Sequence, residues 1–382
     1  MGNPFRQFIV KVCSRCNLNC SYCYVYNLAD ATWKSQPRFM QPEVVLAMCR
    51  CIRQHMEKHG LSRVQVVVHG GEPLLYGKER MEWFLRTVLS ELGGAVDFAI
   101  QTNGTRLDRG WVDLLVRYGV EIGISLDGPQ EYHDRHRVDH RGRGSFAEAV
   151  AGIRCVLAHP EGKRRFRGVL SVADPSIPPE DYFGLMRDLG VPSFSFLLPQ
   201  HNHDRPPPAE HDHLAQWIIR LLELWLEDGK GFSVSFLESM LLALLGSPAG
   251  NNEFFNAHPL DFLVIETDGG IEPSDSLKSC DDGLTKLGLN VLADELDAVY
   301  AHPFMQLAQN AKIHLCETCQ RCEYAASCAG GRMSDRYSRR TGFDNPSVYC
   351  DTLKQVFRHA RTILELIPPD IRQRLADPEP GS

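Results

Sequence analysis

The stretch Phe8-Ile-Val-Lys-Val-Cys13-Ser-Arg-Cys16-Asn-Leu-Asn-Cys20-Ser-Tyr-Cys23 decides the fold. Its first six residues are mostly β-branched or aromatic, which favours a strand, and the remainder places Cys16, Cys20 and Cys23 on the following loop. Three thiolates on one loop suit an iron-sulfur cluster, which normally takes four ligands, so one iron stays open for another molecule. A zinc site completed by Cys13 and a redox dithiol pair are the alternatives that the spacing leaves open.

Outward from this stretch, short β-rich runs alternate with longer amphipathic stretches as far as about residue 200. The runs predict six strands, at residues 8–13, 64–69, 96–102, 120–126, 166–172 and 193–198. This alternation predicts a parallel sheet, so the expected fold class is α/β, an open partial (β/α)6 TIM barrel. In such sheets the active site lies at the carboxyl ends of the strands.

A chain of 382 residues exceeds what one hydrophobic core usually organises, so we expect a smaller cysteine-rich domain after the barrel. A proline-rich segment at residues 206–208 suggests where the barrel ends. The predicted parts are the barrel at 1–200, a helical bridging region at 201–260, a cluster-bearing domain with a C-terminal helix at 261–370, and a tail at 371–382.

Composition narrows the possible partners. The formal net charge of -7 is spread without strong blocks, which argues against a nucleic-acid partner. No run of about 18 apolar residues occurs and Met1 to Arg6 lacks a signal peptide, so we expect no membrane partner and a cytoplasmic location. Nine of the thirteen cysteines lie within residues 13–23 and 316–350, and this grouping in a reducing compartment indicates metal ligation rather than disulfides.

The first cysteine group resembles the signature of the radical S-adenosylmethionine (SAM) superfamily, three cysteines with three and two residues between them. Tyr22 fills the aromatic position usual before the last cysteine. The resemblance implies that Cys16, Cys20 and Cys23 hold a 4Fe-4S cluster, that SAM binds its open iron, and that an electron releases a 5′-deoxyadenosyl radical. The protein then aims and shields the radical.

Further matches to this family follow the strands in order. Each residue alone is more simply explained as part of a turn, but four matches in strand order favour a SAM site. The resemblance implies that these residues contact SAM: Gly70, Gly71, Glu72 and Pro73 after the second strand, Asn103 after the third, Ser125 and Asp127 after the fourth, and then Arg137.

The second cysteine group places Cys319, Cys322, Cys328 and Cys350 within one segment, enough thiolates to close a cluster entirely. Four cysteines also suit zinc, and without the first group zinc would be favoured. With it, the segment resembles the SPASM-type extension of radical SAM enzymes that modify peptides and proteins, and these four cysteines match its second auxiliary cluster.

The departures from that extension are informative. Arg332 and Ser274 stand where two ligands of the first auxiliary cluster are expected, so we predict one auxiliary 4Fe-4S cluster, with Cys280 and Cys316 unassigned. Asp275 remains next to the missing ligand. In sulfatase-maturing relatives an aspartate at this position is implicated in removing a proton, so the resemblance implies a catalytic role; an aspartate capping local backbone is the alternative.

Other segments, among them residues 266–270 and 342–350, resemble enzymes that mature ribosomally made peptides. From this resemblance we expect the adenosyl radical to abstract a β-hydrogen from a precursor peptide and an aromatic ring to be joined to that β-carbon as a cyclophane. The alternative is oxidation of Ser or Cys to formylglycine, as in sulfatase maturation. The expected partners are the peptide and an external electron donor of the flavodoxin or ferredoxin type.

Overall fold

The computed structural model describes residues 3–228, 231–247, 253–255, 259–369 and 372, so most of the predicted tail lies outside the described residues. Internal contacts divide the chain into two compact units. Unit 1 comprises Met1–Leu170, Leu189–Val191 and Leu260–Gln309; unit 2 comprises Ser171–Asp188, Pro192–Pro259 and Asn310–Ser382. The domain boundaries given above stay a prediction.

Unit 1 contains a parallel sheet with its strands in the order β5-β4-β3-β2-β1. The strands are β1 (Gln7–Cys13), β2 (Val64–Gly70), β3 (Val96–Thr102), β4 (Glu121–Ser125) and β5 (Phe166–Val172). These match the first five predicted strands to within one residue at each end, and the α/β fold class is confirmed.

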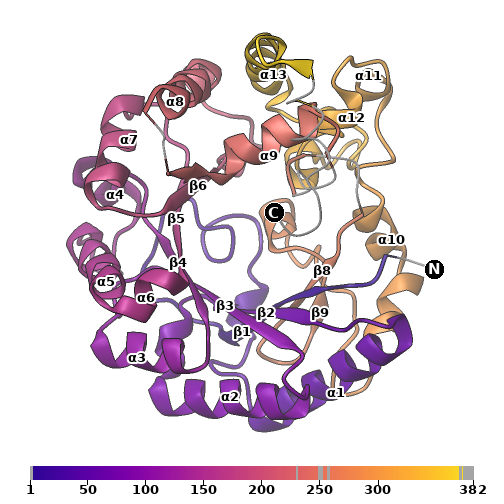
Figure 1. Cartoon of the computed structure of the whole chain (residues 1–382). Helices are drawn as coiled ribbons and strands as arrows, with labels where there is room; N and C mark the ends of the chain where they lie inside the picture. The colour runs from indigo at the N-terminus through magenta and orange to yellow at the C-terminus, as the bar shows by residue number, and fades with distance from the viewer. Residues whose placement is uncertain (1–2, 229–230, 248–252, 256–258, 370–371, 373–382) are drawn as a thin grey trace. The chain divides into compact units, whose positions relative to one another are not determined.

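Helices follow the strands of unit 1 and lie along the outer side of its curved sheet (Figure 1). They are α1 (Pro42–His59), α2 (Lys78–Glu91), α3 (Arg109–Arg117), α4 (Gln130–His136), α5 (Phe146–Ala158) and α6 (Pro160–Arg165). Helix α1 shows how sequence sets these bounds. It starts at a proline, whose missing N–H is no loss in the first turn, and stops at Gly60, which adopts a left-handed φ of 63°.

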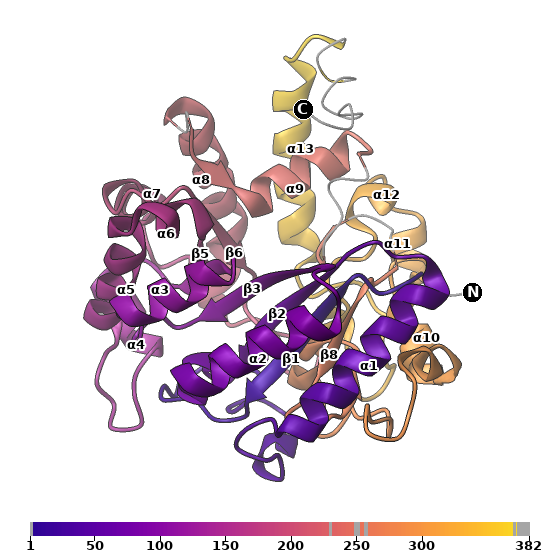
Figure 2. The ribbon, with the colours of Figure 1, turned by 60° about the horizontal axis from the view of Figure 1, so that its bottom comes forward.

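Strand β1 separates an apolar face from a polar one. Its Phe8 ring packs edge-on to the ring of His55 of α1, with centroids 6.2 Å apart, so Phe8 faces the helices. Because side chains alternate along a strand, Lys11 points to the opposite, inner face. The register pairs Lys11 with His69 of β2, which therefore shares that inner face. Figure 2 shows β1, β2 and β3 side by side behind α1 and α2.

A hairpin extends the sheet beyond β1. Strands β8 (Phe262–Ile265) and β9 (Ile271–Glu272) are antiparallel, and the chain turns between them at residues 268–270, whose Asp-Gly-Gly sequence favours a tight turn. No sequence pattern predicts that β8 pairs with β1 in parallel, with Ile9 opposite Val264. This pairing brings the segment after residue 265 to the carboxyl end of the first strand.

The rest of unit 1 is made of short helices. They are η1 (Thr32–Lys34), η2 (Pro73–Tyr76), η5 (Asp275–Ser279), η6 (Leu296–Ala301) and α10 (Pro303–Gln309). No helix among the described residues of the chain is both long and apolar enough to cross a membrane.

Unit 2 contains the sixth predicted strand, β6 (Ser193–Leu197), paired in parallel with the short β7 (Ser233–Val234). Its helices are α7 (Pro179–Asp188), η3 (Ala209–His213), α8 (Leu214–Asp228), α9 (Ser235–Leu244), α11 (Glu317–Gln320), α12 (Ala325–Cys328), η7 (Met333–Arg336) and α13 (Cys350–Glu365). Helix α13 packs against α8 and α9. The core of unit 2 includes the Phe196 ring, which packs edge-on to Trp217 and at a tilt to Phe236.

Candidate active site

The loop after β1 holds Cys16, Cys20 and Cys23 in unit 1. Backbone bonds fold it tightly: Cys23 N–H donates to Cys20 O at 3.0 Å, and Leu18 N–H points at Cys16 Sγ at 3.4 Å. Burial raises the pKa of the Cys20 thiol to about 11 and also raises those of Cys16 and Cys23. Thiols in such surroundings become thiolates only when a cation binds them, so this donor set fits the predicted iron-sulfur cluster.

Gly70 and Gly71 fix the second strand to this loop. Gly71 N–H donates to Cys13 O at 2.8 Å. A Cβ atom at Gly70 would lie 2.2 Å from Cys13 O, and one at Gly71 would lie 1.9 Å from the Tyr26 hydroxyl. Only glycine allows this approach. The glycines therefore shape the cysteine loop, and their predicted contact with SAM stays a prediction.

Glu72 links the ends of β2 and β3. Its fully buried carboxylate accepts hydrogen bonds from Thr102 Oγ1 at 2.6 Å and Asn103 N–H at 2.8 Å, besides one from the backbone at Leu74. Asn103 in turn lies close to the first cysteine, with Nδ2 3.8 Å from Cys16 Sγ. Pro73 is the first residue of η2 and is buried. The structure thus brings these predicted SAM contacts to the edge of the sheet that carries the cysteine loop.

Tyr22, Asp127 and Arg137 form one cluster. The Tyr22 hydroxyl donates to Asp127 Oδ2, and Arg137 Nε donates to the same oxygen at 2.9 Å. The Arg137 guanidinium also lies over the Tyr22 ring, 5.6 Å from its centroid. Although burial opposes it, the guanidinium lowers the pKa of Asp127. Nearby, Ser125 at the end of β4 accepts a bond from Gln101 Nε2 at 3.0 Å.

A charged cluster lies on the inner face of unit 1, where Asp275 begins η5. Lys11 Nζ lies 2.8 Å from Asp275 Oδ1 and 3.7 Å from Glu266 Oε1. The sequence analysis did not single out Lys11, although a lysine inside the apolar run of β1 was a signal. His69 was missed as well. Its Nδ1 is buried without a hydrogen-bond partner among the described residues, and burial lowers its pKa to about 4.

The second cysteine group surrounds a small pocket within unit 2. Cys319 of α11, Cys322, Cys328 at the end of α12 and Cys350 at the start of α13 all line it. This arrangement fits four ligands to one cluster. Cys316 hydrogen-bonds to Cys319 and does not line the pocket, whereas Cys280 belongs to unit 1.

The two residues that replace expected ligands have other partners. Arg332 is fully buried, pairs with Asp335 at 2.6 Å and donates to Pro199 O at 2.9 Å. Ser274 is buried in unit 1 and caps η5 by accepting the N–H of Ser276. Neither side chain is a ligand for iron in these positions, which favours a single auxiliary cluster.

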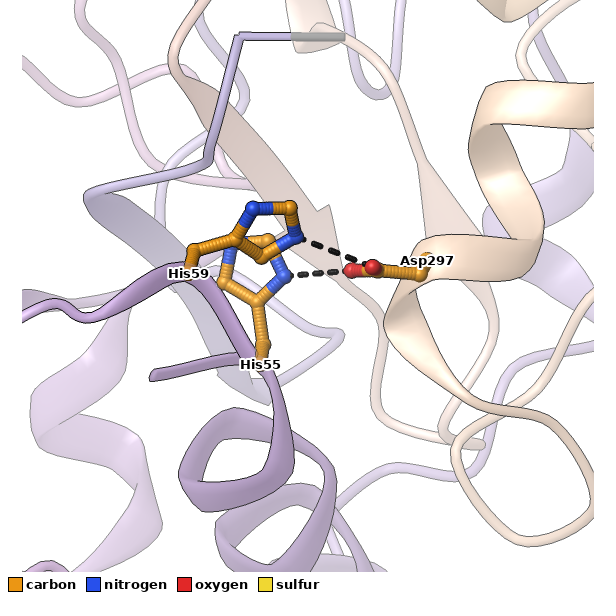
Figure 3. Close-up of side chains that lie close together, drawn as sticks. All are labelled: His55, His59 and Asp297. Carbon is orange, nitrogen blue, oxygen red and sulfur yellow. Dashed lines mark hydrogen bonds and ion pairs between the residues drawn. The ribbon is translucent and has the colours of Figure 1, made fainter. Parts of the chain in front are cut away.

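A third polar cluster consists of His55, His59 and Asp297 (Figure 3). Asp297 contacts His55 Nδ1 at 2.6 Å, His59 Nε2 at 2.9 Å and Lys58 Nζ at 2.8 Å. Phe5 N–H donates to His55 Nε2, so the ring proton sits on Nδ1 and points at Asp297. A metal bound at Nδ1 would move that proton to Nε2, where it would meet the Phe5 N–H. The cluster is therefore better explained as a set of hydrogen bonds that joins α1 to η6.

Comparisons with known proteins agree with this geometry. Residues 10–160 match the model of the Radical SAM superfamily. This part of the chain, which carries the cysteine loop and the strand ends around it, is a radical SAM domain, and the protein is a radical SAM enzyme. SAM and a SAM-binding 4Fe-4S cluster, both predicted, belong to this class, and the four-cysteine pocket fits the predicted auxiliary cluster. The residues assigned to each cofactor stay predictions.

Similar proteins match over nearly the whole length. The cysteine-type anaerobic sulfatase-maturating enzyme of Clostridium perfringens is 24% identical over 94% of this chain and 96% of its own. The serine-type enzyme of Bacteroides thetaiotaomicron is 23% identical over 98% and 94%. The structure of anSMEcpe with bound AdoMet superposes with a TM-score of 0.81 at 20% identity, over 97% of this chain and 99% of that one.

The predicted cyclophane reaction is wrong. The full-length relatives are sulfatase-maturating enzymes, which supports the alternative reaction instead. The error has a chemical reason. Both reactions begin with removal of a hydrogen atom from a β-carbon, so the residues that bind SAM do not reveal what the carbon radical does next.

Proposed function

We propose that this enzyme oxidises the side chain of a cysteine or serine in a polypeptide substrate to formylglycine. The observation that carries the proposal is the buried Asp275, held by Lys11 on the inner face of the same unit as the three cysteines. In the sulfatase-maturing enzymes that the sequence resembles, an aspartate at this position is implicated in removing a proton. The structure of anSMEcpe with AdoMet and the Cp18Cys peptide, which has a TM-score of 0.80, supports a peptide as the substrate class.

The oxidation removes two hydrogens from the substrate. Cys16, Cys20 and Cys23 would hold one cluster and Cys319, Cys322, Cys328 and Cys350 the other. When bound, SAM and these clusters supply an adenosyl radical and an electron acceptor. With them in place, the β-carbon would lose a hydrogen atom and an electron, and Asp275 would take the proton from the substrate hydroxyl or thiol, which leaves an aldehyde from serine. From cysteine it leaves a thioaldehyde, which water converts to the aldehyde with release of hydrogen sulfide.

The partners follow from this balance. The polypeptide must reach Asp275, and an external donor of the flavodoxin or ferredoxin type would supply the electron that starts each turnover. The relatives include both cysteine-type and serine-type enzymes. The first measurement is therefore which of the two residues reacts.

The test uses two synthetic sulfatase peptides that differ only in having cysteine or serine at the reacting position. The anaerobically reconstituted enzyme is incubated with SAM, reductant and each peptide, and the products are examined by mass spectrometry. We expect a serine peptide lighter by two hydrogens, or a cysteine peptide that has also exchanged sulfur for oxygen, together with deoxyadenosine. Deoxyadenosine without a change in either peptide would contradict the proposal, and Cys20→Ala is the control that should give neither product.

A further inference from the structure

We infer that Lys11 is a positioning residue for the reaction, which holds the Asp275 carboxylate in place to receive the substrate proton. This inference rests on the proposed function. The observation behind it is a short ion pair, in which Lys11 Nζ lies 2.8 Å from Asp275 Oδ1. Among the described residues, no other cation lies at ion-pair distance from this carboxylate.

The fold leaves Lys11 little freedom to do anything else. It is 2% exposed and lies inside β1, where strands β2 and β8 pair on either side. Its neighbour across the register is His69, whose low pKa of about 4 keeps it neutral, so His69 does not compete for the carboxylate. A buried ammonium without an anion is strongly unfavourable, which ties Lys11 to Asp275 and to Glu266, 3.7 Å away.

A second layer of ion pairs fixes Glu266. Lys278 Nζ lies 3.0 Å from Glu266 and 2.5 Å from Glu272, and Lys286 reaches Glu272 at 2.9 Å. Although burial opposes it, Lys11 and Lys278 lower the pKa of Glu266 to about 2, so this carboxylate stays charged. Lys278 is the closer cation to Glu266 Oε1, at 3.0 Å against 3.7 Å for Lys11, and the shortest contact of Lys11 is with Asp275.

The charges of this cluster balance. Asp275, Glu266 and Glu272 face Lys11, Lys278 and Lys286, of which only Lys286 is about one-third exposed. When Asp275 accepts the substrate proton, a new O–H bond forms, a bond from the substrate oxygen or sulfur to hydrogen breaks, and the cluster gains one positive charge. That charge is unfavourable beside the buried Lys11, which favours release of the proton to water and return of the carboxylate before the next turnover.

The test compares Lys11→Met with Lys278→Met, a matched control. Both variants remove a buried lysine from the same cluster, but Lys278 is not among the side chains that contact Asp275 at ion-pair distance. The readout is the ratio of oxidised peptide to deoxyadenosine, measured in the same reaction at equal iron content. Lys11→Met should still form deoxyadenosine and lower the ratio by about a hundredfold, the usual contribution of a proton-transfer group, and Lys11→Arg should restore part of it. Lys278→Met, which affects Asp275 only through Glu266, should lower the ratio much less than Lys11→Met does.

A second comparison remains decisive if Lys11→Met folds poorly. In the Asp275→Asn background, Lys11→Met removes a lysine whose charged partner is already gone, so it should cause no further loss of peptide oxidation. A further loss in that background, an unchanged ratio in Lys11→Met, or an equal drop in Lys278→Met would overturn the inference. Failure of the proposed function shows separately, as a wild-type enzyme that oxidises neither peptide.

Discussion

Arg332 and Asp335 form a buried ion pair in unit 2, with Arg332 Nη2 2.6 Å from Asp335 Oδ1 and each side chain 1% exposed. The guanidinium also lies 5.0 Å from the centroid of the Phe254 ring and donates to the Pro199 carbonyl. The pair stands at the position where the SPASM pattern has a cysteine. Where that pattern has a metal ligand, this chain therefore has a salt bridge.

Removing one member of this pair should destabilise unit 2. Burial raises the pKa of Asp335 to about 6 even though Arg332 opposes the rise, so Arg332→Met leaves a buried carboxyl group without its cation. We expect a loss of about 3 kcal/mol in the free energy of unfolding, measured by anaerobic denaturant titration. Adding Asp335→Leu should recover most of it, and iron content should not change in either variant. A fall in iron of half or more would instead make Arg332 part of a cluster site.

Substitutions should distinguish the roles of the two cysteine groups. Cys20→Ala should abolish deoxyadenosine formation and lower the iron content by about half, because only one of two clusters is lost. Cys322→Ala should lower iron by a similar amount, retain deoxyadenosine formation and lose peptide oxidation. Cys155→Ala, on α5 outside both groups, is the control and should behave like the wild type. Loss of deoxyadenosine in Cys322→Ala would show that the groups are not independent.

Because Gly71 is closely packed, a single added methyl group there should strongly weaken SAM binding. In Gly71→Ala the new Cβ would lie 1.9 Å from the Tyr26 hydroxyl and 2.5 Å from the Arg15 backbone, so the cysteine loop must move. We expect SAM binding, measured by equilibrium dialysis, to weaken at least about tenfold, since roughly 1.4 kcal/mol of distortion suffices. Gly184→Ala in α7 meets nothing within 4 Å and should leave SAM binding unchanged. Normal binding by Gly71→Ala would show that the loop adapts.

Stability should fall as the pH drops below about 6.5. His133 is fully buried: its Nδ1 accepts the Asp127 N–H at 3.2 Å and its Nε2 donates to Ser145 Oγ at 3.1 Å. Burial lowers its pKa from 6.5 to about 4, so between these values the unfolded chain binds a proton that the folded chain does not. The loss at pH 5 is roughly 2 kcal/mol.

This pH effect is isolated by His133→Gln, which has no titrating group. The difference between its unfolding free energy and that of the wild type should be constant above pH 6.5 and should shift in favour of the variant as the pH falls toward 5. Denaturant titrations at several pH values give this difference. Parallel curves would mean that His133 is protonated in the folded protein.

Much of the fold was predictable because it depends on local patterns. The β-rich runs predicted β1 and β2 to within one residue at each end. The glycine at 60, where α1 ends, and the Asp268-Gly269-Gly270 turn of the hairpin are local signals of the same kind. These signals work because strand propensity, helix ends and tight turns depend on residues close together in the chain.

The candidate site was predictable only in part. Cysteine spacing marked both groups, because most of the cysteines in each group lie only a few residues apart in the chain. The reaction was not predictable, since the same first step serves several products. Tyr22, Asp127 and Arg137 were each identified, but as separate contacts to SAM, and the structure shows them bonded to one another.

By itself, the sequence determined the strands, the cysteine loop and the four-cysteine segment, because each depends on residues close together in the chain. Only the tertiary structure decided that Lys11 meets Asp275, since 264 residues separate them and the contact requires β8 to pair with β1. Burial at that place makes the lysine need an anion and the carboxylate need a cation. A pattern of residue types carries no information on such a pairing until the sheet is assembled.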